Sequence, residues 1–315
     1  MNEKVDLSII IVSWNVKELL KKCLGSIYNN QGDLKLEIFV VDNASKDGSI
    51  EEIEKLSQPE AGQPLAENKE IKDLNLKIIK NKKNLGFTKA NNQAIKRAQG
   101  EFILLLNPDA EVINGALEKM VEFMREHKKC GVAGCKLLNS DESLQPSVRR
   151  FPTFWSQAMI MLKLHHLFPN AGPIKKYFAK DFDYRGMGQG THTYPCDQVM
   201  GAFFMIRREV IEKIGMLDEN FFIWFEEVDF CKRVKDAGWQ VCYTPEAEII
   251  HHGAQSFKQV LSFKKQRMFN RSLLYYFKKH KPWWQWLGLM LLQPISLGLS
   301  VIIQIFAKKS NKVIE

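Results

Sequence analysis

The sequence predicts an α/β fold in which a mostly parallel sheet is flanked by helices. Short apolar segments alternate with segments of helical spacing from residue 7 to residue 138. Several apolar segments end abruptly in polar residues, as at 102–106, which runs into Asn107-Pro108-Asp109. Because ligands of such sheets bind just beyond the carboxyl ends of the strands, polar residues at these ends are candidates for a functional site.

The expected elements follow the chain in a regular order. We expect strands at 7–12, 36–41, 76–80, 102–106, 132–138, 201–206, 241–244 and 248–250. Helices are expected at 16–28, 49–56, 88–99, 115–127, 208–214 and 226–237. Ser49 and Thr88 are expected to cap their helices, and Gly100 and Gly238 to end theirs. Residues 57–73 read as a surface excursion, and the regular alternation fades between 139 and 195.

The composition is that of a globular protein that favours anionic partners. The 315 residues are 45% hydrophobic and 26% charged, and the formal net charge is +9. Such a charge suits a nucleotide, a phospholipid surface or nucleic acid. No arginine-rich arm or zinc-finger spacing is present, which argues against nucleic acid. The six cysteines form no Cys-x-x-Cys pair and are expected to be buried thiols in a reducing compartment, and no signal-peptide pattern opens the sequence.

A dinucleotide-binding dehydrogenase is the first alternative for an alternating α/β chain. That class needs a Gly-x-Gly-x-x-Gly turn after the first strand. Here the first strand runs into Ser13-Trp14-Asn15 instead. The glycines at 186, 188 and 190 open no helix, so they predict a loop and not a phosphate cradle. The dehydrogenase reading therefore loses its main support.

The last sixty residues differ in character from the rest. Residues 260–279 predict a basic, aromatic helix, and residues 283–306 are almost uncharged. The latter segment is about as long as a bilayer span of roughly 20 residues. Trp283, Trp284 and Trp286 sit where an interfacial belt would lie, beside a cluster of lysines and arginines suited to an anionic leaflet. We expect this segment to attach the protein to a membrane. The alternatives for residues 283–306 are a helix that spans the bilayer, a helix that lies in its plane and a helix buried in the protein.

Three acidic sites stand at the ends of expected strands or at the start of a helix. They are Asp42, Asp109 and the group Glu226, Glu227 and Asp229. A carboxylate such as Asp109 can hold a hard cation that bridges diphosphate oxygens. Each site also has an ordinary explanation. Asp42 can cap a turn, the glutamates can complement a helix N-terminus, and Asp229 can pair with Arg233 four residues on.

Seven sequence blocks follow one another in order through most of the chain. They are IIIVSWN (9–15), VDNASKDGS (41–49), NKKNLGFTKANNQAI (81–95), LLLNPDA (104–110), SLQPSVRRFPT (143–153), the stretch from MGAFF to DAGW (200–239) and IIHHGAQS (249–256). Taken together, these blocks resemble the family 2 glycosyltransferases of the GT-A fold, in particular the rhamnosyltransferase-like branch. The VDNAS, NPDA and FEEVDFCKR blocks together are specific for this family, but no single block would identify it.

The resemblance implies a nucleoside-diphosphate sugar as donor. It assigns the nucleotide to the end of the first strand and to Asp42, whose carboxylate suits the N3–H of a pyrimidine. Glycine at 86 and the helix after it would line the nucleotide pocket, and Gly201-Ala202 would shape the floor of the sugar pocket. The implied donor-binding residues are Val12, Ser13, Trp14, Asn15, Asp42, Gly86, Asn91, Asn107, Gly201 and Ala202.

The resemblance also implies a divalent metal, Mg²⁺ or Mn²⁺, and a catalytic base. Asp109 matches the last acid of the family's DxD motif, and Asn107 replaces the first acid. His251 matches a position that supplies a metal ligand in some members, and His252 is the weaker choice. Glu227 stands where the family has its base, usually an aspartate, and Glu226 and Asp229 are expected to raise its pKa by repulsion. Acceptor contacts are expected from Arg149, Arg150, Glu226 and Asp229.

These points together predict an inverting glycosyltransferase attached to the cytoplasmic face of a membrane. Rhamnose is the best single choice of sugar, and the acceptor would be a lipid-linked or cell-surface polysaccharide glycan. We expect a catalytic domain at 1–257, with a nucleotide-binding half at 1–138 and an acceptor half at 139–257, followed by a membrane-associating tail at 258–315. Two alternatives remain, a non-catalytic sugar-nucleotide-binding or assembly protein and a nucleotidyltransferase. The latter would need a glycine- and lysine-rich loop after the first strand, and Ser13-Trp14-Asn15 is not one.

Overall fold

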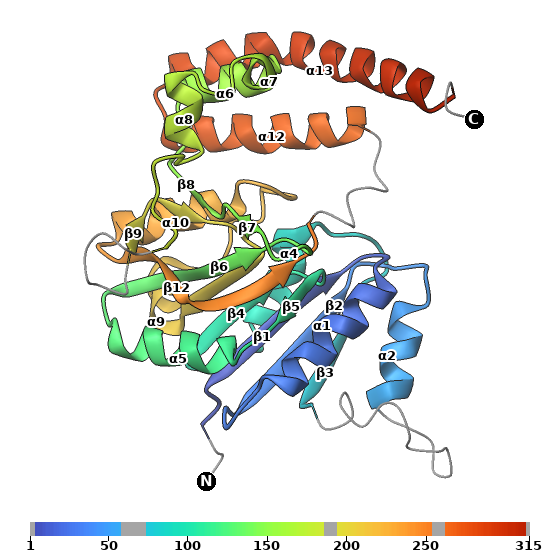
Figure 1. The fold of residues 1–315 in the computed structure, drawn as a ribbon, viewed down its shortest axis with the longest axis vertical. Coiled ribbons are helices and arrows are strands. Elements are labelled where there is room, and N and C mark those ends of the chain that lie inside the picture. Colours follow the sequence, from blue (N-terminus) through green and yellow to red (C-terminus); the bar gives the residue numbers. More distant parts are fainter. Residues whose placement is uncertain (1–3, 58–73, 186–193, 254–261, 313–315) are drawn as a thin grey trace.

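The computed structural model describes residues 4–57, 74–185, 194–253 and 262–312 (Figure 1). One half of the main sheet is parallel. Its strands lie in the order β3 (Leu76–Lys80), β2 (Leu36–Asp42), β1 (Leu7–Ser13) and β4 (Phe102–Leu106). Because these strands share one direction, their carboxyl ends meet at one edge of the sheet. Of the surface excursion predicted at 57–73, all but Ser57, which ends a helix, lies outside the described residues, as does the glycine loop at 186–190.

The second half of the sheet is mixed. β11 (Phe203–Arg207) runs antiparallel between β4 and β6 (Cys130–Leu138), and β12 (Gln240–His251) lies parallel to β6. β5 (Ala110–Val112), β7 (Leu144–Gln145) and β9 (Tyr194–Cys196) add antiparallel pairs, while β8 (Val148–Arg149) pairs with β10 (Gln198–Val199) in a separate small sheet. The predicted α/β class with a mostly parallel sheet is confirmed.

Two hydrophobic cores lie on opposite faces of the sheet, as the alternation of side chains along each strand requires. In β1, Ile9 and Ile11 face the core formed with α1 (Lys17–Asn29), α2 (Ser49–Ser57) and α5 (Ala116–Glu126). Ile10 and Val12 face the other core, which contains α4 (Phe87–Ile95), α9 (Arg208–Ile214) and α10 (Glu226–Asp236). Helices therefore cover both faces.

Several helix ends differ from the sequence prediction. Ser49 was expected to cap α2. Instead, the Asp47 side chain accepts a hydrogen bond from the Ser49 backbone N–H at 3.1 Å at the start of this helix. α4 begins one residue before Thr88, which lies inside the helix. It ends at Ile95, well before Gly100, where a Cβ would lie 2.5 Å from the Ser8 backbone nitrogen. Gly238 does follow α10, with a φ of +85°.

Two predicted late strands form one bent strand. β12 continues from Gln240 to His251, and its pairing with β6 shifts between Thr244 and Glu248. A local irregularity of this kind bends a strand without ending it. The bend brings the end of β12 next to β5, where His251 pairs with Ala110. It therefore places His251 beside Asp109.

A layer of helices covers one end of the molecule and was not predicted as such. It contains α6 (Phe154–Met161), α7 (Leu164–Leu167) and α8 (Gly172–Tyr177) together with α12 (Ser262–His280) and α13 (Trp283–Lys312), at the top of Figure 1. A third core cluster joins this layer to α10 through Phe225, Val228 and Tyr276. By length and composition alone, Trp283–Gln304 could cross a membrane, with a mean hydropathy of 1.9.

Candidate active site

The ends of β1 and β2 form the first part of the site. Ser13 and Asp42 are paired in register, and both are buried. Asp42 accepts hydrogen bonds from the Ser45 backbone N–H at 3.1 and 3.2 Å, so it does organise a turn. A carboxylate offers about four acceptor positions, which leaves room for a ligand donor. Asn15 supports the same turn, because its backbone N–H donates to Ser45 Oγ at 3.0 Å.

Gly86 connects the β2 end to the loop that precedes α10. The Phe87 N–H donates to the Phe222 carbonyl at 2.7 Å, and a Cβ at Gly86 would lie 2.5 Å from that carbonyl oxygen. The Gly86 φ of +87° also favours glycine. Asn43 Nδ2 donates to the Gly86 carbonyl at 3.2 Å. The close approach that Gly86 permits is therefore to the chain itself, which ties the strand ends to the start of α10.

Asp109 and His251 meet at the neighbouring strand ends. His251 Nε2 lies 3.3 Å from Asp109 Oδ1, and the His252 N–H donates to the Asp109 carbonyl at 2.9 Å. Both side chains are about 93% buried. His252 turns away, with its Nε2 2.7 Å from Glu111 Oε1. Of the two histidines, His251 is the one beside Asp109, as predicted.

The hydrogen bonds behind His251 determine its tautomer. Ser143 Oγ donates to the Asp141 carboxylate, so it accepts from Asn139 Nδ2 at 2.9 Å. Asn139 Oδ1 is then the acceptor for Gln145 Nε2 at 2.7 Å. Gln145 Oε1 therefore accepts from His251 Nδ1 at 2.7 Å. A neutral imidazole at this position carries its proton on Nδ1 and turns the lone pair of Nε2 toward Asp109.

Asn107 and Ala202 lie next to the pair formed by Asp109 and His251. The Asn107 N–H donates to the Ala202 carbonyl at 3.1 Å, and its side-chain Nδ2 lies 3.2 Å from His251 Nε2. A Cβ placed on Gly201 would meet nothing within 4 Å, so there is open space beside that residue. The residues expected at the floor of the sugar pocket are thus bonded to the Asp109 segment.

Glu226 and Glu227 begin α10, and each has a buried Oε2 without a hydrogen-bond partner in the described part of the chain. Burial raises the pKa of both carboxyls, and the charge of Glu227 raises that of Glu226 further, well above its usual range. Two adjacent buried carboxylates resist being charged together. The pair therefore favours a state with one proton, and of the two carboxyls Glu226 has its pKa raised further. The pKa of Glu227 is raised, as expected, but burial is the cause, and neither Glu226 nor Asp229 is among the causes.

The backbone that presents these glutamates is strained. Trp224 and Phe225 have φ values of +62° and +70°, which residues with bulky side chains rarely adopt. Neighbouring elements hold the segment in place, because Ser272 Oγ of α12 donates to the Ile223 carbonyl at 2.7 Å. Among the described residues, other buried polar atoms without a hydrogen-bond partner include Ser13 Oγ at the end of β1 and Thr88 Oγ1, Asn91 Oδ1 and Asn92 Oδ1 on α4, together with Gln157 Oε1 on α6. Such atoms are uncommon in native proteins and indicate a ligand site.

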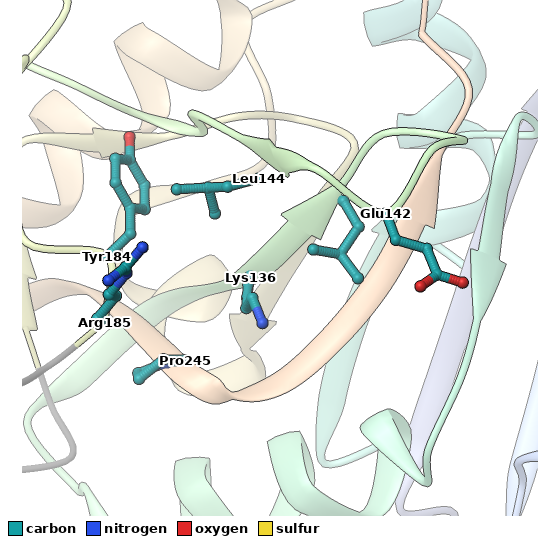
Figure 2. Close-up of a pocket in the computed structure, with 7 residues that line it drawn as sticks. Lys136, Glu142, Leu144, Tyr184, Arg185 and Pro245 are labelled. Atoms are coloured by element: carbon teal, nitrogen blue, oxygen red, sulfur yellow. The ribbon is translucent and has the colours of Figure 1, made fainter.

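A hollow of about 460 Å³ lies beside β6, β7 and β12, away from these acids. Figure 2 shows Lys136, Glu142 and Tyr184 around it. None of Asp42, Asp109 or Glu227 lines it. The Lys136 amine is paired with Glu248 at 2.9 Å, so it has a structural partner. This hollow is not the candidate active site.

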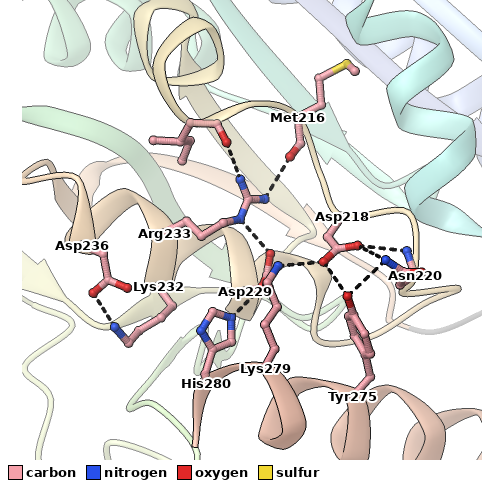
Figure 3. Close-up of polar contacts among 11 residues, drawn as sticks. Met216, Asp218, Asn220, Asp229, Lys232, Arg233, Asp236, Tyr275, Lys279 and His280 are labelled. Atoms are coloured by element: carbon pink, nitrogen blue, oxygen red, sulfur yellow. Dashed lines mark hydrogen bonds and ion pairs between the residues drawn. The ribbon is translucent and has the colours of Figure 1, made fainter.

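Asp229 does not fit its expected role in acceptor binding. Its carboxylate is fully buried and bonded to Arg233 Nε at 2.8 Å, Lys279 Nζ at 2.7 Å and His280 Nε2 at 2.6 Å (Figure 3). Burial opposes its ionisation, but the hydrogen bonds from His280, Lys279 and Arg233 prevail and lower the pKa of Asp229. Arg233 also donates to the carbonyls of Ile214 and Met216. Asp229 is therefore a buried link between α10 and α12, and no surface pair.

The two arginines expected near the acceptor differ in their surroundings. Arg149 lies over the Phe178 ring, 4.9 Å from its centroid, and its charge acts on Tyr177, as does that of Glu227. Burial raises the pKa of Tyr177, Arg149 lowers it and Glu227 raises it. Arg150 instead pairs with Asp181 at 3.5 Å on the surface. Only Arg149 is thus connected to the neighbourhood of Glu227 by these contacts.

Bonds between neighbouring segments join the predicted residues at one edge of the sheet. The chain of contacts passes from Asp42 through Asn43 and Gly86 to Phe222, four residues before Glu226. β4 leads into Asp109 beside β1, on the side opposite β2. The sequence did not reveal roles for Asn43, Gln145 or Tyr177. Asn43 and Gln145 lie within the sequence blocks that carry the resemblance, and Tyr177 is a single aromatic residue. None of the three belongs to a periodic pattern that would have indicated a role.

Residues 8–215 match the family described as glycosyl transferase family 2. The chain is 22% identical over 290 residues to N-acetylglucosaminyl-diphospho-decaprenol L-rhamnosyltransferase of Mycobacterium tuberculosis, covering 89% of this chain and 86% of that protein. It is 25% identical over 252 residues to the rhamnosyltransferase WbbL of Escherichia coli, covering 78% and 82% of the two chains.

Among solved structures, a mannosyltransferase from Pyrobaculum calidifontis in complex with GDP-Man and Mn²⁺ is similar to this chain. The TM-score is 0.57 at 16% sequence identity, and the match covers 96% of this chain and 74% of that chain. At this level of identity the likeness concerns the fold, and it agrees with the expected GT-A architecture.

Proposed function

The chain belongs to glycosyl transferase family 2 and is a glycosyltransferase, and we propose that it transfers rhamnose with inversion from a nucleoside-diphosphate sugar to a lipid-linked glycan. The two rhamnosyltransferases that it resembles over most of their length support the choice of sugar. The mycobacterial relative is named for an N-acetylglucosaminyl-diphospho-decaprenol, which supports a lipid-linked acceptor. We place the enzyme on the cytoplasmic face of the membrane, where soluble nucleotide sugars are made.

The observation that carries the mechanism is the half-buried Glu227, whose buried Oε2 has no hydrogen-bond partner among the described residues. Glu227 accepts the proton of the acceptor hydroxyl as that oxygen bonds to the anomeric carbon. The bond from this carbon to the diphosphate oxygen breaks on the opposite face, so the configuration inverts. Glu226 keeps its own proton, which leaves Glu227 to take up the acceptor's. The strained turn at Trp224 and Phe225 fixes where the carboxylate points.

The strand ends are proposed to hold the donor. Asp42 would accept from the base, Ser13 and Asn91 would supply the unpartnered polar atoms, and Gly201 would leave room for the sugar. Trp14 and Val12, at the end of β1, would complete the nucleotide side. Arg149 is proposed to meet a phosphate of the acceptor, because its charge lies on the same side of the site as Glu227.

A divalent metal, Mn²⁺ or Mg²⁺, is proposed to be held by Asp109 and His251. The donor set fits, since an imidazole lone pair on Nε2 faces a carboxylate oxygen 3.3 Å away. Among the described residues no cluster of three or more His, Cys, Asp or Glu side chains is placed to hold a metal. Donor phosphates and water would therefore complete the coordination. When bound, the metal would stabilise the charge of the departing diphosphate.

The test is turnover of radiolabelled dTDP-rhamnose with Mn²⁺ and a short-chain polyprenyl-diphospho-N-acetylglucosamine. We expect labelled lipid product and free dTDP. Glu227→Gln should lower kcat by about 10²- to 10⁴-fold and leave the Kd for the donor within about twofold. Glu246→Gln, a change of the same kind on the exposed side of β12, is the matched control. Unchanged kcat in Glu227→Gln would remove this residue from the role, and no product from any nucleotide sugar would favour a non-catalytic binding protein.

A further inference from the structure

The outward face of α13 is apolar, and its inward face combines serines with apolar residues, so the helix has no polar side to present to water. Ser296 and Ser300 are buried against the protein, together with Leu289. Leu291, Ile295 and Ile302 are at least half exposed. Large apolar side chains on an outer surface mark a site that contacts another apolar phase or partner.

The contact between α12 and α13 is polar at its centre. Asn270 is fully buried, accepts a hydrogen bond from Gln266 Nε2 at 2.8 Å and lies 3.5 Å from Ser296 Oγ. Large aliphatic side chains on the outer face, with the exposed Trp283 and Trp284 at one end, are typical of a helix at a lipid interface. This arrangement favours a lipid phase over another protein as the occupant of the outer face.

α6 and α7 extend the same apolar surface. Phe154 of α6 contacts Trp284, with ring centroids 6.2 Å apart, and a Cβ on Gly288 would lie 2.7 Å from the Phe154 ring. Next to Phe154, Trp155 is 66% exposed, and Leu167 of α7 is 72% exposed. Contact between these residues and the C-terminal helices was not predicted from the sequence.

The position of α12 decides how α13 meets the membrane. α12 lies alongside α13 in Figure 1, and its other side packs on the catalytic domain through Ser272 and Tyr276. α12 also exposes Arg267, Arg271 and Lys278. If α13 crossed the bilayer in this arrangement, α12 would carry these charges into the hydrocarbon. With α13 in the plane of the membrane, the same charges lie at the level of the lipid headgroups.

We infer that α6, α7 and α13 form an in-plane docking surface for a bilayer that contains anionic lipid, and that α13 does not span it. The inference deepens the membrane attachment proposed above. Trp155, Leu167, Trp284, Leu291 and Ile295 enter the interface between headgroups and acyl chains. The acids at the sheet edge then stay in water, close to a membrane-bound acceptor.

Spin labels on the full-length chain test the orientation. Cysteines are introduced singly as Leu291→Cys, Ile295→Cys and Ile302→Cys, positions that share one helix face; the six native cysteines are buried. Labelled protein is bound to vesicles of phosphatidylglycerol and phosphatidylethanolamine, and depth is measured from collision with oxygen and with a water-soluble nickel chelate. An in-plane helix gives one shallow depth for all three labels. A spanning helix separates the first and last by about 16 Å, a result that would overturn the inference.

Flotation with the same vesicles tests the part played by α6 and α7. The double variant Trp155→Ser/Leu167→Ser should lower the vesicle partition coefficient roughly tenfold. Leu144→Ser removes an exposed apolar residue from β7 and should leave binding unchanged. Equal binding of the double variant and the wild type would exclude α6 and α7 from the surface. Neither measurement needs substrate, so both can be repeated in Glu227→Gln, which separates failure of docking from failure of the proposed transfer.

Discussion

His280 Nε2 lies 2.6 Å from Asp229 Oδ1, which joins the last turn of α12 to the first turn of α10. Lys279 strengthens the link by contacting both Asp229 and Asp218 at 2.7 Å. Because Glu226 and Glu227 begin α10, the C-terminal basic helix takes part in positioning the proposed catalytic carboxylate and its neighbour. The helical layer proposed to face the membrane and the candidate active site therefore share one structural element.

Asp229→Asn should destabilise the protein strongly. The change leaves Arg233, Lys279 and His280 without their shared buried anion, and breaking a buried ion pair from one side costs about 3–5 kcal/mol. Urea unfolding followed by circular dichroism measures the loss. Asp236→Asn removes an exposed pair with Lys232 on the same helix and should cost less than about 1 kcal/mol. Similar losses in the two variants would contradict the importance assigned to Asp229.

Acid should loosen the contact between α12 and the segment before α10, where Lys279 pairs with Asp218. Burial raises the pKa of Asp218, but hydrogen bonds from Lys279 and Asn220 prevail and lower it to about 2. An unfolded aspartate has a pKa of about 3.9. Because the folded value is lower, the stabilisation is complete above the unfolded pKa and is lost as the pH falls toward the folded pKa. The free energy of unfolding should fall between about pH 5 and pH 2. This fall should be smaller in Lys279→Met, with Lys278→Met as the control.

Gln145→Leu should weaken metal binding without removing a proposed ligand. Gln145 accepts the Nδ1–H of His251 and so directs the Nε2 lone pair toward Asp109. Loss of such a supporting hydrogen bond typically lowers metal affinity about 10- to 100-fold. Calorimetric titration of Mn²⁺ in the presence of dTDP measures the change. Gln145→Glu keeps an acceptor and should retain most of the affinity. If both variants bind Mn²⁺ as the wild type does, Gln145 does not support the site.

The parts of the fold that follow from repeating patterns could be predicted from the sequence. Runs such as Phe102–Leu106 are strands because they are buried on both faces, and a buried strand needs an unbroken apolar run. The ends of elements were harder to predict. Thr88 looked like a cap, yet the turn before α4 is determined by contact between Gly86 and Phe222, which are 136 residues apart. Local propensity carries no information about such a contact.

The residues of the candidate site also differ in whether the sequence could predict their positions. Asp42 and Asp109 could be predicted because they follow strands of a parallel sheet, and that topology places them at one edge. The structural role of Asp229 could not, because it depends on α12 packing against α10, with partners fifty residues further along the chain. Gln145 was also missed, since its role appears only once the bend in β12 brings His251 beside it.

Glu226→Gln should make the protein more stable at neutral and alkaline pH. Burial, together with the charge of Glu227, raises the pKa of Glu226 well above that of an unfolded glutamate, about 4.3. For a carboxyl with a raised folded pKa, the folded state binds the proton more tightly, so stability falls as the pH rises above the unfolded value. A glutamine has no proton to lose, and this part of the pH dependence should disappear. Urea unfolding from about pH 4 to pH 8 should show the variant gaining on the wild type as the pH increases. Glu246→Gln, at an exposed position, should follow the wild type throughout. A constant difference between Glu226→Gln and the wild type at every pH would show that Glu226 is ionised in the folded protein, and would assign the shared proton to Glu227.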